Sequence, residues 1–296
     1  MSAKNYHIFT DATMDLPQEL MKELSSITII PMQITVSNTE TGECYDWESN
    51  QIQVNKSFCH LQRNGFQAKT SQISPAVYTQ YFESVLKQGS DIIYLGFSSG
   101  LSGSFQSALL SAEQLQIRYP ERTILCIDSL CASVGLGFLV LEATRLQKSG
   151  VSIEDLAQWA EAYRMNINHW FTIDTFEYLR RGGRISGSSA TLGSVLNIKP
   201  VLNIDHAGTL QTDEKARGRR KALSVLMNRL NKQWLPKTSS QIIIGHGDCI
   251  EDAENLKSLI LNHYPNAEIY LSEIGPVIGA HTGPGVLALI FYGISR

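Results

Sequence analysis

The chain has 296 residues, which is long enough for a full hydrophobic core and for two domains. Hydrophobic residues make up 43% and charged residues 18%, which excludes a disordered chain, and a net charge of -3 argues against a general nucleic-acid-binding protein. The sequence contains no apolar run of 18 residues and no N-terminal signal peptide, so we expect a cytoplasmic protein without a transmembrane helix.

The first half of the sequence alternates strands and helices. Tyr6–Asp11 predicts a strand that ends in a polar turn, and Pro17 opens a helix with Asp15 as its N-cap. Residues 37–66 are polar, and we expect them to be irregular with helical patches. The further expected elements are helix 17–24, strand 28–36, a helix from Pro75 through Leu86, strand 91–95, helix 104–118, strand 122–127, helix 132–148 and helix 153–164 behind a capping box at 152–155.

This alternation predicts a parallel sheet with helices on both faces, and a ligand at the carboxyl ends of its strands. Four polar pairs occupy such strand ends or loops: Thr10-Asp11, Thr70-Ser71, Ser98-Ser99 and Asp128-Ser129. Thr70 and Ser71 alone would be ordinary helix-entry residues. Beside the other three pairs, we favour contact with a ligand.

After about residue 166 the pattern changes to one of hairpins and longer helices. The expected elements are strand 170–173, helix 175–181, helix 189–195, strands 199–204 and 209–213 around a turn at 206–208, helix 216–234, strand 241–245, helix 251–263, strand 268–272 and strand 286–292. The predicted fold class is therefore α/β with two domains. Residues 1–165 form an N-terminal parallel-sheet α/β/α domain, and residues 166–296 form a C-terminal α+β domain with a mixed sheet.

Two glycine-rich segments predict an anion-accepting site assembled from distant parts of the chain. Ile278–Gly285 predicts a tight turn. In this turn the side chains of His281 and Thr282 would bind the ligand, and Gly283 would let the ligand come close to the backbone. His281 also has a simpler interpretation as a satisfied core histidine. Gly96–Gly103 follows an apolar strand and precedes a helix, which is typical of an anion nest at a helix N-terminus.

The second segment allows two other interpretations. Gly96–Gly100 matches G-x-S-x-G, so Ser98 could be the nucleophile of a serine esterase or thioesterase with His281 as its base. The acid of that triad could be Asp174, Asp205 or Asp248. A purely structural turn is the remaining alternative. We favour anion binding, because the turn is longer and richer in glycine than a nucleophile elbow requires.

Four other features carry weaker signals. His246 and Asp248 are metal-ligand types without further spaced ligands, and the five scattered cysteines lack a CxxC pair, so we expect no metal site and free thiols. Gly182-Gly183-Arg184 predicts a helix end and a turn. The basic run 215–221 is either a solvated helix start or a docking site for a phosphate-bearing partner, since arginine suits phosphate.

Taken together, these segments resemble the DegV family, bacterial fatty-acid-binding proteins that include the FakB subunits of fatty acid kinase. The matching segments, in order, are 10–13, 15–17, 70–72, 74–75, 98–103, 128–129, 178–179, 182–185, 197–200, Arg217 and 275–285. They cover nearly the whole chain. Ile73 replaces the usual proline of the TSQPSP run, and Leu130-Cys131 departs from the common residues after Asp128-Ser129. Neither departure removes a head-group ligand.

The resemblance implies a carrier, not an enzyme, that holds one long-chain fatty acid in the cleft between the two domains and has no cofactor. The residues implied to bind the ligand are Thr70, Ser71, Ser98, Ser99, Gly100, His281, Thr282 and Gly283. A partner fatty acid kinase would convert the bound acid to acyl phosphate for phospholipid synthesis, and Arg184, Arg217 and Arg219 are the candidate docking residues. The resemblance implies no nucleic-acid partner and admits transient contact with a membrane.

Overall fold

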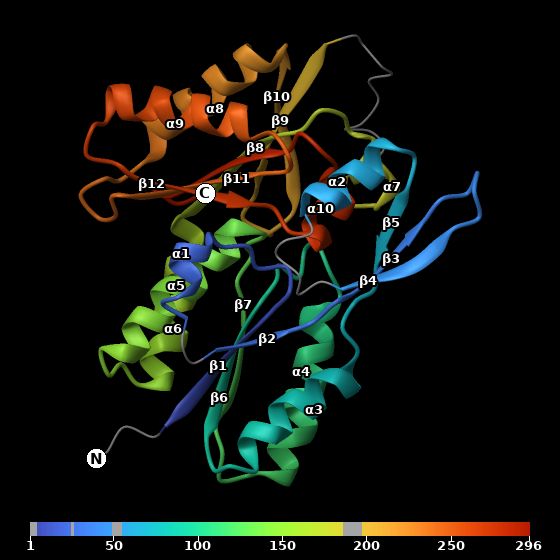
Figure 1. The fold of residues 1–296 in the computed structure, drawn as a ribbon. Coiled ribbons are helices and arrows are strands. Elements are labelled where there is room, and N and C mark those ends of the chain that lie inside the picture. Colours follow the sequence, from blue (N-terminus) through green and yellow to red (C-terminus); the bar gives the residue numbers. More distant parts are fainter. Residues whose placement is uncertain (1–4, 25–26, 49–54, 186–196) are drawn as a thin grey trace.

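A four-stranded parallel sheet forms the base of the molecule (Figure 1). The computed structural model describes residues 5–24, 27–48, 55–185 and 197–296. The sheet has the order β2-β1-β6-β7, with β1 (Tyr6–Asp11), β2 (Ile27–Ile30), β6 (Asp91–Gly96) and β7 (Ile124–Asp128). Every residue of β6 is buried, as expected for a strand covered on both faces.

Two pairs of helices cover the two faces of this sheet, as the alternation predicted. The helices are α3 (Pro75–Leu86) and α4 (Ser104–Arg118) on one side and α5 (Val134–Lys148) and α6 (Ile153–Tyr163) on the other. Half of the predicted capping box is confirmed, because Ser152 Oγ accepts a hydrogen bond from Asp155 N at 3.1 Å, while the Asp155 carboxylate accepts from the Ser152 hydroxyl at 2.7 Å. The helix expected at 17–24 is only one turn long, α1 (Gln18–Met21).

The single strand expected at 28–36 is two strands in different sheets. Pro31 separates β2 from β3 (Gln33–Ser37), because proline has no N–H to donate to a continuing ladder. β3 pairs antiparallel with β4 (Cys44–Glu48) and with β5 (Gln67–Thr70) in a small projecting sheet. The segment expected to be irregular thus contains β4 as well as α2 (Asn55–Arg63).

A six-stranded mixed sheet forms the second half of the fold, as predicted. Its order is β10-β9-β8-β13-β11-β12. The strands are β8 (Ile167–Thr172), β9 (Ile198–Ile204), β10 (Leu210–Arg217), β11 (Gln241–His246), β12 (Glu268–Glu273) and β13 (Leu287–Tyr292). The helices of this half are α7 (Glu177–Arg181), α8 (Arg219–Gln233), α9 (Ile250–His263) and α10 (Pro276–Thr282).

The predicted hairpin of β9 and β10 is confirmed, since the two strands pair antiparallel. Helix α8 starts three residues later than predicted, because β10 continues to Arg217 and Gly218 takes a positive φ of 83° before the helix. The helix expected at 189–195 lies outside the described residues. The domain boundary at 165/166 stays a prediction, although the parallel sheet ends at Asp128 and the mixed sheet begins at Ile167.

Helix α5 lies between the two large sheets. It contacts β6 of the parallel sheet and β8, β11 and β13 of the mixed sheet. The side chain of Asp15, in the loop after β1, accepts hydrogen bonds from Ser133 Oγ before α5 at 2.5 Å and from Gly275 N before α10 at 2.9 Å. One buried carboxyl group therefore joins three segments that are distant in sequence.

The stability of the protein should depend on the protonation of Asp15. Burial raises the pKa of Asp15 from 3.8 to about 7, so the folded state holds this proton more tightly than the unfolded chain does. The stabilisation is fully present below about pH 4 and is lost as the pH rises through about 7, by up to about 4 kcal/mol. We expect Asp15→Asn to flatten the fall in Tm between pH 5 and 8. Parallel pH profiles of Tm for the two proteins would contradict this assignment.

Candidate functional site

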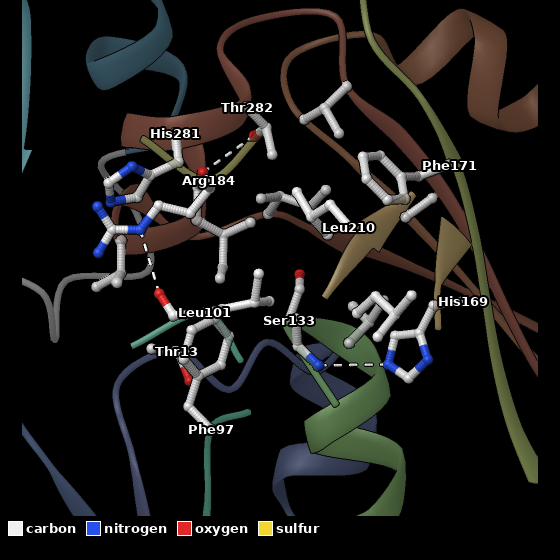
Figure 2. Close-up of a pocket in the computed structure, with 18 of the residues that line it drawn as sticks. Thr13, Phe97, Leu101, Ser133, His169, Phe171, Arg184, Leu210, His281 and Thr282 are labelled. Atoms are coloured by element: carbon white, nitrogen blue, oxygen red, sulfur yellow. Dashed lines mark hydrogen bonds between the residues drawn. The ribbon is translucent and has the colours of Figure 1, made fainter. Parts of the chain in front are cut away.

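An apolar tunnel runs between the two large sheets (Figure 2). Its wall is formed by α5, α7 and α10, by strands β8, β9, β10 and β13 of the mixed sheet, by the end of β5, and by loops that follow the strands of the parallel sheet. Its empty volume, which includes the solvent space at its opening, is about 800 Å³. Fifteen of its lining residues are apolar: Met32, Phe97, Leu101, Ala132, Val134, Phe171, Leu179, Ile204, Leu210, Ile274, Val277, Ile278, Val286, Ala288 and Ile290. Such a wall favours a long hydrocarbon over any polar molecule of equal size.

Hydroxyl groups also line the tunnel, but two of them direct their protons away from it. Thr13 Oγ donates to the buried carboxylate of Asp11 at 2.5 Å, and Ser133 Oγ donates to Asp15. A buried hydroxyl without an acceptor would be costly, so the two aspartates allow hydroxyls in an apolar wall. Thr282, a predicted ligand residue, likewise donates to a carbonyl oxygen of its own helix, that of Ile278, at 3.0 Å.

The polar end of the tunnel is formed by His281, Thr70, Ser102 and Arg184. The imidazole Nε2 of His281 lies 2.8 Å from Thr70 Oγ1, and its buried Nδ1 has no hydrogen-bond partner among the described residues. Burial, and after it the nearby guanidinium of Arg184, lowers the pKa of His281 to about 4. The ring is therefore neutral at pH 7. The neutral imidazole carries one N–H proton and Thr70 carries one hydroxyl proton. Their mutual hydrogen bond uses one of these two protons and leaves the other free for a ligand.

Helix α10 sets the position of His281, which corrects the prediction of a tight turn over residues 278–285. Pro276 stands at the first position of the helix, and only the residues from Gly283 onward form a turn. Gly283 has a φ of 73°, and a Cβ there would lie 2.3 Å from the ring of Tyr178. Gly182 makes room for the imidazole in the same way, since a Cβ there would lie 2.3 Å from Nδ1 of His281.

The serine–glycine turn, residues 98–103, does not form the expected anion nest. The N–H of Ser99 donates to the Asp128 carboxylate, that of Gly100 to Ser98 Oγ, and those of Leu101 and Ser102 to the carbonyl of Ser98. Four N–H groups that could face an anion are thus used inside the protein. Ser99 and Gly100 line a separate open groove, which shares Leu101, Ser102, Arg184 and Leu210 with the tunnel.

Ser98 is not placed as a hydrolytic nucleophile, so the hydrolase hypothesis is not supported. Its side chain is fully buried, and Oγ donates to the carbonyl oxygen of Gly208 at 2.7 Å. The imidazole of His281 bonds Thr70 instead. A nucleophile elbow needs an exposed hydroxyl beside its base. Ser98 instead fastens the serine–glycine turn to the β9–β10 turn, where a Cβ on Gly208 would lie 2.2 Å from Oγ.

The sequence could not distinguish among the hydroxyls of each predicted pair. Thr70 lines the tunnel, whereas Ser71 is exposed and its N–H donates to Gln33 O. Ser102 lines the tunnel, whereas Ser98 and Ser99 do not. The only sequence signal for Ser102 is that residues 98–103 contain three serines. Nothing in this segment indicates which of the three side chains faces the tunnel.

The three candidate docking arginines have different surroundings. Arg184 lies at the polar end of the tunnel, where its Nε donates to the carbonyl of Leu101 at 3.2 Å (Figure 2). Arg217 is exposed on β10. Arg219 pairs with Asp252 at 2.8 Å, and its side chain is 17% exposed, so its charge is already partnered.

Within the described ranges, no group of three or more His, Cys, Asp or Glu residues could hold a metal ion. No helix in the part of the chain that the structure describes is both long enough and apolar enough to cross a membrane.

The fold and the cavity define an α/β protein whose two sheets enclose an apolar tunnel with one polar end. The chain belongs to the DegV family: residues 5–293 match the family described as "Uncharacterised protein, DegV family". A DegV domain-containing protein of Clostridium perfringens is 40% identical over 293 residues, which are 99% of either chain.

Solved structures of DegV proteins resemble this one over nearly their whole length. A DegV family protein from Thermus thermophilus, described as binding fatty acid, is 30% identical, with a TM-score of 0.81 over 98% of this chain and 100% of that chain. DegV of Bacillus subtilis, described as a fatty acid binding protein, is 29% identical, with a TM-score of 0.78 over 97% and 99%. The Streptococcus pneumoniae fatty acid kinase B3 protein, loaded with linoleic acid, shares the fold at 22% identity, with a TM-score of 0.80 over 97% and 99%.

Replacing Ser98 should affect stability and leave ester hydrolysis unchanged. Ser98→Ala leaves the buried carbonyl of Gly208 without its donor, and we expect a loss of about 1–3 kcal/mol in the free energy of unfolding. Ser99→Ala, at the exposed neighbouring position, is the matched control and should change stability by less than about 0.5 kcal/mol. Denaturant unfolding measures both changes. Rapid hydrolysis of acyl esters that Ser98→Ala abolishes would contradict this role.

Proposed function

We propose that this protein binds one long-chain fatty acid, with the acyl chain in the tunnel and the carboxylate at the polar end. The single observation that carries this proposal is the asymmetry of the tunnel. The hydroxyl protons of Thr13, Ser133, Thr282 and Ser102 are used internally, whereas the Thr70–His281 pair keeps one spare proton beside the charge of Arg184 at one end. An amphipathic acid matches that distribution. The fatty-acid-binding relatives from Thermus thermophilus and Bacillus subtilis support the same ligand.

The head group is held by Thr70, Ser102, His281 and Arg184. Thr70 and His281 have one proton beyond the one in their mutual bond. Ser102 lines the same end, and its hydroxyl, which donates to Ser104 Oγ at 3.0 Å, has to turn to reach the acid. Arg184 adds the positive charge that a half-buried carboxylate requires. This set keeps Thr70 and His281 from the predicted ligand residues, adds Ser102, and gives head-group binding to Arg184, which the sequence analysis named as a docking residue. Ser71, Ser98, Ser99, Gly100 and Gly283 shape the surrounding loops.

The hydrocarbon supplies most of the affinity. A chain of about 16 carbons buried at about 0.8 kcal/mol per methylene gains more than about 10 kcal/mol before the costs of association are subtracted. The polar end then fixes the direction of the acid and leaves its carboxylate close to the open groove. A carrier needs this arrangement, because the insoluble chain is hidden while the reactive group remains accessible.

We further propose that the protein presents the carboxylate to a fatty acid kinase and performs no phosphoryl transfer itself. In that reaction a carboxylate oxygen attacks the terminal phosphate of a nucleotide held by the kinase, giving acyl phosphate and nucleoside diphosphate. The proposal rests on the resemblance to FakB subunits, on the groove beside the tunnel mouth and on exposed Arg217.

We also keep the proposed division into two domains, residues 1–165 and residues 166–296, with the fatty acid bound between them.

Mass spectrometry of the purified protein tests the ligand. We expect an organic extract to contain one fatty acid per chain, and a native spectrum to show the same mass added to the protein. Delipidated protein that takes up neither palmitate nor oleate would overturn the proposal. Thr70→Val removes a head-group donor and should lower retention of the acid. Ser71→Ala, the exposed neighbour, is the matched control and should retain it as the wild type does.

The role of Arg217 is tested with the kinase subunit and ATP. We expect Arg217→Ala to reduce the rate of acyl phosphate formation several-fold while the content of fatty acid stays at one per chain, because the guanidinium is exposed and lies outside the tunnel lining. Hydroxylamine trapping measures the product. Lys232→Ala, at the exposed far end of α8, serves as the control for lost surface charge. Equal rates for Arg217→Ala and the wild type would remove Arg217 from the docking surface.

A further inference from the structure

A second imidazole lines the tunnel at the end opposite the head group. Figure 2 shows His169 and Phe171 on one side of the tunnel and His281 and Arg184 on the other. His169 belongs to β8, in the middle of the mixed sheet, and its side chain is buried. A histidine at the end of an otherwise apolar wall is not explained by recognition of the carboxylate.

Both ring nitrogens of His169 are bonded to backbone groups. Nδ1 lies 3.0 Å from the carbonyl oxygen of Ile167, to which it donates, and Nε2 accepts from the N–H of Ala132 at 3.3 Å. Burial and then the charge of Arg296 lower the pKa of His169 well below its usual value. The ring is therefore neutral, and it bridges β8 and the residues that lead into α5.

The ring cannot move toward α5, because Gly135 already lies against it. A Cβ at position 135 would lie 1.9 Å from Nε2 of His169. Two hydrogen bonds and this close approach thus hold the imidazole in one place across the far end of the tunnel. A wall that cannot yield sets a definite length for the molecule inside it.

From this geometry we propose that His169 closes the tunnel and sets the longest acyl chain that the protein accepts. This inference rests on the proposed fatty-acid function and adds a specificity-determining residue to it. Replacing the imidazole by a methyl group leaves room for about two further methylene groups, since close packing lets ligand atoms fill the volume of a removed side chain.

The test is a competition among saturated acids of 14 to 20 carbons, present in equal amounts with delipidated full-length protein and read by native mass spectrometry. We expect His169→Ala to shift the preferred acid toward longer chains, with about a 15-fold gain in relative affinity for two added methylene groups. Gly135→Ala should shift it toward shorter chains, because the new Cβ pushes the ring into the tunnel. His169→Gln, which can form both backbone bonds, should keep the wild-type profile.

The two variants act in opposite directions, so general destabilisation cannot mimic both results. Folded His169→Ala protein with the wild-type chain-length profile would overturn the inference. If His169→Ala fails to fold, a wild-type chain-length profile for Gly135→Ala would overturn the inference instead. Wild-type protein that takes up none of the acids would instead overturn the proposed function itself.

Discussion

The arrangement of this protein depends on the rule that a buried hydrogen-bond donor requires an acceptor. Asp11 shows the rule most fully, because its buried carboxylate accepts from the N–H and hydroxyl of Thr13, from the Tyr94 hydroxyl and from the N–H of Phe97. Asp15 does the same for Ser133 and for the N–H of Gly275. These carboxylates fix the loop after β1 against both layers of the fold, and they also keep donors out of the apolar wall.

Two histidines line the same tunnel and serve different purposes because their partners differ. His169 has both nitrogens bonded to backbone and is part of the wall. His281 has one nitrogen bonded to a hydroxyl that can exchange partners, one nitrogen without a partner, and a guanidinium nearby. Burial keeps both rings neutral in the structure described here. A carboxylate placed beside His281 would favour its charged form and raise its pKa.

The serine–glycine turn gains its shape from a distant hairpin. Ser98 donates to Gly208, and a Cβ on Gly100 would lie 2.7 Å from the carbonyl oxygen of Ala207. Gly100 therefore allows two backbones to approach closely and is not needed to cradle an anion. Leu101 and Leu210, next to these two turns, both line the tunnel and the open groove.

The sequence by itself determined the alternating elements, the parallel and mixed sheets, the β9–β10 hairpin and the parts of the chain that approach the tunnel. These follow from local periodicity, caps and turns, which neighbouring residues encode. Only the tertiary structure decided that Thr70 and Ser102 face the tunnel, that Ser98 is buried against Gly208, and that His169 lies at the far end. The physical reason is that the direction of a turn side chain depends on a backbone group arriving from far along the chain. No local pattern around Ser98 records that Gly208, 110 residues later, supplies the acceptor.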